Sequence, residues 1–237
     1  MIKFFRKIRY NLMEQNKTGK YFKYAIGEII LVVIGILIAL SINNWNENRK
    51  DRNKEISILK ALHKDFKNNL NDFNRIKELH INTLNKQNIV LRNIDKFPNP
   101  KAIDSIFNYG KNMFGGYTYN ASNGTIESLI SSGDINLITN DTLKNYLVSW
   151  KDVLEDYSEE EIISQRLWHT AIEPYMIKKG LFYKPNTQRQ LKLIQDTVFL
   201  SMLKRKQHYT ERIVNEMLVE NSIEDYLKEI VRLSKTD

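Results

Sequence analysis

The chain has 237 residues, enough for one or two domains, and its 9 Gly and 4 Pro argue against a long, turn-rich β architecture. It contains no Cys, which excludes a disulfide framework, a cysteine metal site and a thiol nucleophile. The formal net charge of +8 is concentrated at the N-terminus, because residues 1–23 carry seven Lys or Arg against one Glu. We therefore predict no nucleic-acid partner, since the rest of the chain is a mixed-charge surface.

Residues 1–23 form a basic arm in which Ile2, Phe5, Ile8 and Leu12 recur at the spacing of one helix face. Four basic residues lie on the other faces: Lys3, Arg6, Lys7 and Arg9. A helix of this kind lies in the membrane interface and attracts anionic lipid, each charge contributing roughly 1 kcal/mol. Membrane lipid is therefore a predicted partner of the arm. The alternative is that the charges only orient the following segment and form no ordered helix.

Residues 24–45 are a predicted transmembrane helix. No polar side chain occurs in the 12 residues from Ile29 to Leu40, and Glu28 is the single charge in residues 24–42. A helix of that length reaches roughly 28 Å, close to the hydrocarbon thickness of a bilayer. Tyr24 and Trp45 lie at its two ends, as expected of the aromatic belts at membrane surfaces. We expect Glu28 to reach the headgroups, with pairing to a preceding lysine as the alternative.

The same segment has features of a cleaved signal peptide, because Ala39 and Ser41 are small residues after a basic and then an apolar region. Against cleavage, the basic region is long, and the helical pattern continues past Ser41 to Trp45. We therefore predict an uncleaved anchor. Gly35 and Ala39 lie one helical turn apart, and such a small-residue pair can support dimerisation of membrane helices.

The basic residues that flank the predicted span indicate its orientation. Seven Lys or Arg precede it, and four follow it: Arg49, Lys50, Arg52 and Lys54. Since the side richer in basic residues stays in the cytoplasm, we predict a cytoplasmic N-terminus. The predicted organisation is a cytoplasmic arm (1–23), a single transmembrane helix (24–45) and an extracytoplasmic helical domain (46–237).

Residues 47–95 contain no Pro or Gly and predict one long helix. Apolar residues recur every three or four positions along much of it: Leu59, Leu62, Phe66, Leu70, Phe73, Ile76, Leu84 and Leu91. Steps of seven residues from Leu59 reach Phe66 and Phe73, but then His80 and Gln87, which are polar. This interruption favours an antiparallel bundle over a strict coiled coil.

The rest of the chain predicts further helices and no strands, so the predicted class is all-α. After Pro98 and Pro100 we expect a helix over 102–113, a glycine-rich loop over 114–125, and a short helix ended by Gly133. Asp141 is the predicted cap of the next helix, and Ser158 with Glu161 matches a capping box that opens another, running towards Pro174. A tail over 189–233 is predicted helical again.

The residues that could carry chemistry show no catalytic, cofactor or metal pattern. The four His lack metal-ligand spacing and are expected at the surface or the core edge. The acidic run at 155–161 lacks the spacing of a calcium loop and is expected to be a solvated helix start. We therefore predict that the protein is not an enzyme and has no cofactor. Phe114, Tyr117 and Tyr119, in the glycine-rich loop, are the best candidates for a ligand or partner surface, with packing of the bundle as the alternative.

Two stretches carry a resemblance to a known family. "MIKFFRKIR" with "KYFKYAIGEIILVVIGILIALSINNWNENRK", and more loosely "TIESLISSGDINLITNDTLKNYL", resemble a family of uncharacterised bacterial single-span membrane proteins, a domain of unknown function. The closer match covers residues 1–54. The resemblance implies an uncleaved anchor followed by a helical domain, and it implies no activity, cofactor or partner. Together with the predicted orientation, a bacterial family implies an inner-membrane protein whose residues 46–237 lie in the periplasm.

Two hypotheses for function follow. The first is a non-catalytic structural or protein-interaction module in which the helical domain binds a partner protein or a second copy of itself. The second is a sensor-like bundle that binds a ligand near Tyr117 and Tyr119 and acts through a partner. A sizeable apolar pocket with converging polar groups would favour the second hypothesis, whereas a solid bundle would favour the first.

Overall fold

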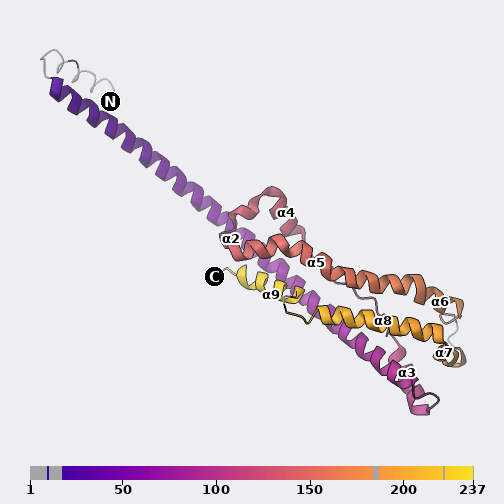
Figure 1. The fold of residues 1–237 in the computed structure, drawn as a ribbon. Coiled ribbons are helices and arrows are strands. Elements are labelled where there is room, and N and C mark those ends of the chain that lie inside the picture. Colours follow the sequence, from indigo (N-terminus) through magenta and orange to yellow (C-terminus); the bar gives the residue numbers. More distant parts are fainter. Residues whose placement is uncertain (1–9, 11–17, 184–186, 221, 237) are drawn as a thin grey trace. The chain divides into compact units, whose positions relative to one another are not determined.

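The computed structural model describes residues 10, 18–183, 187–220 and 222–236, and these residues form helices and no β-strand (Figure 1). The predicted all-α class is therefore confirmed. The elements in chain order are α2 (Thr18–Ile94), α3 (Pro100–Gly110), α4 (Gly124–Ser132), the 3₁₀-helix η1 (Asp134–Leu137), α5 (Asp141–Leu167), the π-helix η2 (Trp168–Ile172), α6 (Glu173–Lys178), α7 (Thr187–Leu193), α8 (Thr197–Glu216) and α9 (Ile223–Leu233).

The chain divides into two compact units, residues 1–55 and residues 56–237. Helix α2 contributes residues to both units, as the long first helix predicted from the sequence. Within Ala25–Ile94, the most apolar stretch has a mean hydropathy of 2.8, and none of it is buried. It is the one stretch among the described residues long and apolar enough to cross a membrane.

The end of α2 and the start of α3 follow from backbone chemistry. Proline restricts the residue before it and cannot donate a helical hydrogen bond, so α2 ends before Pro98. Pro100 instead opens α3, where a missing N–H is tolerated, and the Asn99 side chain accepts a 2.9 Å hydrogen bond from the Lys101 backbone N–H. The predicted helix 102–113 therefore starts two residues earlier and ends at Gly110, before Asn112, whose φ of 61° is left-handed.

Helix α2 buries one row of residues in the second unit, and this row keeps a seven-residue repeat. The buried positions alternate at spacings of four and three: Leu62, Phe66, Asn69, Phe73, Ile76, His80, Thr83, Gln87 and Val90. The polar residues that interrupted the apolar repeat in the sequence thus occupy the same buried row. His80 is only 4% exposed, so its predicted place at the surface or core edge was wrong.

Three helices pack along this row of α2: α5, α8 and α9 (Figure 1). The main core contains Phe66 and Phe73 from α2 against Leu147 and Trp150 from α5, with Leu227 from α9. Edge-on ring contacts, such as Phe66 to Trp150 with centroids 5.2 Å apart, add to the burial of apolar area.

A second, smaller core lies around the last turns of α2, with α3, α7 and the first turns of α8. Between the two cores, α2, α5 and α8 each bury polar side chains at corresponding positions along the bundle. These buried polar residues are His80, Thr83 and Gln87 on α2, Glu161 and Ser164 on α5, and Lys206, Gln207 and Thr210 on α8. We call them the polar layer.

Several predicted boundaries differ from the structure. The predicted capping box at Ser158 was wrong, because α5 runs unbroken through it and the Ser158 hydroxyl donates to the Leu154 carbonyl at 2.6 Å. Asn140, not Asp141, caps α5 through a 3.0 Å hydrogen bond from the Leu143 backbone N–H. The predicted helical tail is three helices, α7, α8 and α9. Gly133 ends α4 at φ 77°, which confirms its predicted role.

Candidate ligand pocket

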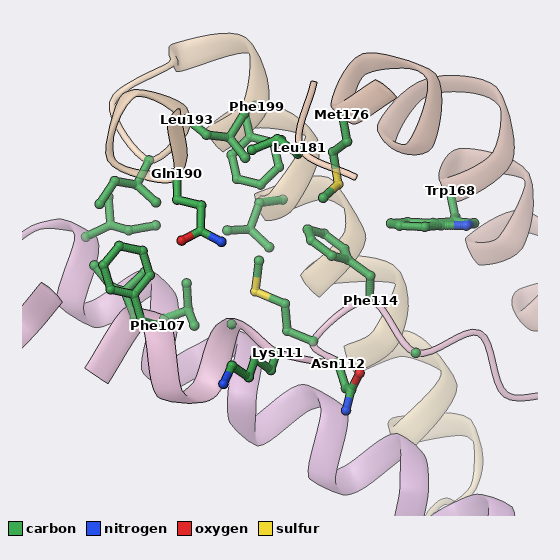
Figure 2. Close-up of a pocket in the computed structure, with 18 of the residues that line it drawn as sticks. Phe107, Lys111, Asn112, Phe114, Trp168, Met176, Leu181, Gln190, Leu193 and Phe199 are labelled. Atoms are coloured by element: carbon green, nitrogen blue, oxygen red, sulfur yellow. The ribbon is translucent and has the colours of Figure 1, made fainter. Parts of the chain in front are cut away.

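A pocket of about 540 Å³ opens in the second core. Its volume falls within the range of small-molecule sites, roughly 300–1,000 Å³. It is lined from five directions: the end of α2, α3 with the following loop, η2, α6 with the residues after it, and α7 with α8. Figure 2 shows these side chains converging on one space from separate helices.

The loop after α3 places aromatic side chains at the pocket. Asn112 adopts the left-handed backbone conformation, which Asn tolerates better than most residues, and this turn redirects the chain after Gly110. Met113 and Phe114 then enter the second core. At Gly115 a Cβ would lie 2.5 Å from a ring carbon of Tyr117, so a larger residue there would displace the Tyr117 side chain.

The pocket walls are mainly aromatic and sulfur-containing. Phe114 lies between Trp168 and Phe199 (Figure 2). Its ring centroid is 5.3 Å from that of Trp168 and 6.1 Å from that of Phe199. Trp168 begins the π-helix η2, and irregular turns of this kind are frequent at functional sites. Met113 and Met176 add unbranched side chains that adapt to irregular shapes.

Polar groups at the pocket are few. Lys111 is the one charged side chain among the described lining residues, and Asn112 and Gln190 supply amides. The side chains of these three residues make no hydrogen bond or ion pair within the described parts of the chain. In Figure 2 the Gln190 amide points into the space between the apolar side chains, while Lys111 and Asn112 lie together just after α3, exposed and with their polar ends directed away from that space.

The three aromatic residues predicted for a binding loop separate in the structure. Phe114 and Tyr117 line the pocket. Tyr119 does not join them: it is 3% exposed and packs in the main core, with its ring centroid 5.2 Å from that of Phe73. Burial, with a smaller contribution from the charge of Asp72, raises the pKa of Tyr119 far above its usual range.

Glu161, in the polar layer, organises a buried network beside this loop. Its carboxylate accepts hydrogen bonds from the Tyr157 hydroxyl at 2.6 Å and from the Tyr119 backbone N–H at 3.0 Å, and His80 Nε2 lies 3.2 Å away. Burial and the neighbouring carboxylate raise the pKa of Tyr157 far above its usual range. The predicted solvated acidic helix start was therefore wrong for Glu161, which is 2% exposed.

Lys206 and Ser164 form the second buried pair of the polar layer. The ammonium group donates to the Ser164 hydroxyl at 2.7 Å and to the Ser164 carbonyl at 2.9 Å. Burial lowers the pKa of Lys206 to about 8. A lysine beside a serine at this distance is also found in nucleophile–base pairs, but neither residue lines the pocket. The pair contributes to packing between α5 and α8.

The residues predicted for the membrane segment belong to the first unit. Trp45 is exposed, with the Arg49 guanidinium carbon 5.6 Å from its ring centroid. Gly35 has open space around it, Ala39 is exposed and Glu28 is partly buried. The backbone of Tyr24 is helical. The basic residues Lys3, Arg6, Lys7 and Arg9 lie outside the described residues.

Sequence comparison identifies the family. A family described as "Family of unknown function (DUF6090)" matches residues 28–218, which is most of the chain, and the protein therefore belongs to it. No match was found among curated proteins or among solved structures. Across the described residues, no group of three or more His, Asp or Glu side chains is placed to hold a metal ion.

Proposed function

We propose that this member of a family of unknown function is a membrane-anchored helical domain that binds a small, mainly apolar ligand without catalysing a reaction on it. The pocket in the second core carries this proposal. Its volume, its enclosure by several helices and its mainly apolar lining with a few polar groups are the features of small-molecule sites. We therefore prefer the ligand-binding hypothesis to the protein-interaction module, which was the first hypothesis from the sequence alone.

The anchor supports a location at a membrane. The apolar stretch of α2 is long enough to cross a bilayer, and seven basic residues precede it. We place the N-terminus in the cytoplasm and the pocket outside it, at a bacterial inner membrane. A sensor-like role follows, in which occupancy of the pocket is read by a partner protein or by a second copy of the chain.

The proposed absence of catalysis is supported by the side chains around the pocket. Among the described lining residues, Lys111 and Tyr117 are the titratable ones, and the two are not hydrogen-bonded to each other. A general acid–base reaction needs a positioned donor and acceptor near the reacting atoms. The buried pair of Lys206 and Ser164 has such contact but does not line the pocket.

Fluorescence quenching at Trp168 tests whether the pocket binds. The full-length chain with Trp45→Phe is placed in phosphatidylcholine nanodiscs and titrated with decanol that carries a terminal bromine, a heavy atom that quenches nearby tryptophan. We expect saturable quenching that disappears when Trp168→Phe is added. Quenching that increases linearly with the concentration of the probe would contradict the proposal. Quenching that persists without Trp168 would also contradict it, because the remaining tryptophan, Trp150, lies in the main core and not at the pocket.

A further inference from the structure

We infer that the ligand of this pocket is a single-chain amphiphile with an anionic head group, such as a long-chain carboxylate, and that Lys111 binds the head. This inference rests on the proposed function and adds the class of ligand to it. It is carried by three observations on the lining residues: the sign of their charge, the hydrogen-bond donors that they offer, and the shape of their apolar surface.

The charge at the pocket has one sign. Lys111 is the charged residue among the described lining residues, and no Asp or Glu accompanies it there. Within the described chain, Lys111 also makes no ion pair. Lys111 and the adjacent Asn112 are exposed, so they lie at the edge of the pocket, where they can contact an anionic head group whose chain enters the apolar part.

The hydrogen-bonding groups match an acceptor. The Lys111 ammonium can only donate, whereas the amides of Asn112 and Gln190 each offer two N–H donors beside one carbonyl acceptor. None of these three side chains is engaged with another described residue. A carboxylate or a related anion accepts several such bonds at once, whereas an ammonium head group would face Lys111 with like charge.

The apolar part of the pocket fits a flexible chain of moderate length. At roughly 30 Å³ for each small group, the share of one water molecule in the liquid, a volume of about 540 Å³ corresponds to about 18 such groups. That suits one alkyl chain, whereas a two-chain phospholipid has far more heavy atoms. Met113, Met176 and Phe107 supply an adaptable surface rather than a rigid slot.

The test compares two ligands of equal chain length that differ in the head group. Terminally brominated decanoate and decanol are titrated, at a pH where the carboxylate is ionised, against the full-length chain with Trp45→Phe in phosphatidylcholine nanodiscs. Quenching of Trp168 reports occupancy. The partition of each ligand into empty nanodiscs is measured separately and used to correct its dissociation constant. After this correction, we expect the carboxylate to bind about tenfold more tightly than the alcohol. We expect Lys111→Met to remove that preference by weakening the binding of the carboxylate about tenfold more than the binding of the alcohol.

Matched variants separate a specific contact from a general charge effect. Lys101→Met removes an exposed lysine of α3 that does not line the pocket, and it should keep the preference for carboxylate. Lys111→Arg keeps the charge and should keep most of the preference. Two results would overturn the assignment of an anionic head group while leaving the proposed function intact. One is equal binding of the two ligands by the unmodified pocket. The other is an equal loss of the preference for carboxylate in Lys111→Met and Lys101→Met. Failure of both ligands to quench Trp168 overturns the proposed function itself.

A lipid of the bilayer is the other source of an anionic amphiphile. Phosphatidylglycerol with brominated acyl chains, built into the nanodisc, tests this source with the same Trp168 signal. We expect no quenching of Trp168 above that of the Trp168→Phe variant. Quenching by this lipid that decanoate reverses would show that the pocket takes a membrane lipid, and it would overturn the single-chain assignment.

Discussion

Lys206 shows how one buried side chain makes the stability of the bundle depend on pH. It is 2% exposed, its ammonium group contacts Ser164, and it makes no ion pair with a described carboxylate. Removing a charge from water without an opposite charge is costly, which is why the pKa falls to about 8 from 10.5. The folded state therefore binds this proton less tightly than the unfolded state does.

The first prediction concerns the pH dependence that Lys206 causes. Between the folded pKa of about 8 and the unfolded pKa of 10.5, the unfolded state binds more protons, so the free energy of unfolding should rise with pH. The rise amounts to about 2 kcal/mol from about pH 7 to pH 9.5. In Lys206→Met this rise should disappear, as measured by chemical denaturation of the full chain in detergent. The control is Lys204→Met, which removes an exposed lysine of the same helix; an equal rise in the Lys206 variant would contradict the interpretation.

At the scale of elements, α2 is the helix against which the rest of the second unit is arranged. Its buried row contains both apolar residues and polar residues, and two of the polar residues, Asn69 and Gln87, contact the loop between α3 and α4. Asn69 exchanges two hydrogen bonds with the Ser122 backbone, at 2.9 and 3.0 Å. Gln87 donates to the Met113 carbonyl at 2.8 Å. These two contacts attach the loop between α3 and α4 to α2, and that loop carries Phe114 and Tyr117.

The second prediction tests this attachment. Asn69→Ala removes both hydrogen bonds to Ser122, and we expect it to lower the free energy of unfolding by about 2 kcal/mol, since two backbone groups lose their partner. Asn71→Ala changes an exposed residue of the same type on the same helix, and we expect no loss. Chemical denaturation followed by tryptophan fluorescence measures both variants. Equal effects in the two variants would show that the loop is held by other contacts.

At the scale of the whole molecule, the two units have opposite relations to solvent. The first unit exposes a run of large apolar side chains from Ile29 to Ile42, most of them about half exposed. The second unit buries its apolar side chains in two cores and exposes a mixed-charge surface. This run is long and apolar enough to cross a bilayer.

The third prediction is the orientation of the anchor. A reporter active only outside the cytoplasm, fused after Asp237, should be active in cells and should run on a gel at the mass of the full-length fusion. Activity at a mass shortened by a segment ending near Ser41 would mean cleavage, and no activity would reverse the orientation. As a control, replacing Lys3, Arg6, Lys7 and Arg9 with Gln should reduce reporter activity, because it leaves three basic residues before the span against the four that follow it.

The features predicted correctly from the sequence are those whose physical causes are local. A run of apolar residues indicates the candidate span whatever surrounds it, proline limits its own backbone and that of its neighbour, and Gly133 adopts a left-handed conformation that other residues resist. The all-α class follows from periodic patterns within single segments. Family membership rests on the same linear information.

The burial of polar residues and the pocket were decided by tertiary structure alone. Glu161 reads as part of a solvated acidic run until Tyr119 and His80, 42 and 81 residues away in sequence, supply its partners. Tyr117 and Tyr119 are two residues apart in one loop, yet one lines the pocket and the other lies in the main core. Such outcomes depend on which helices meet, because a polar group is stable inside a protein only where a distant segment brings it a hydrogen-bonding partner.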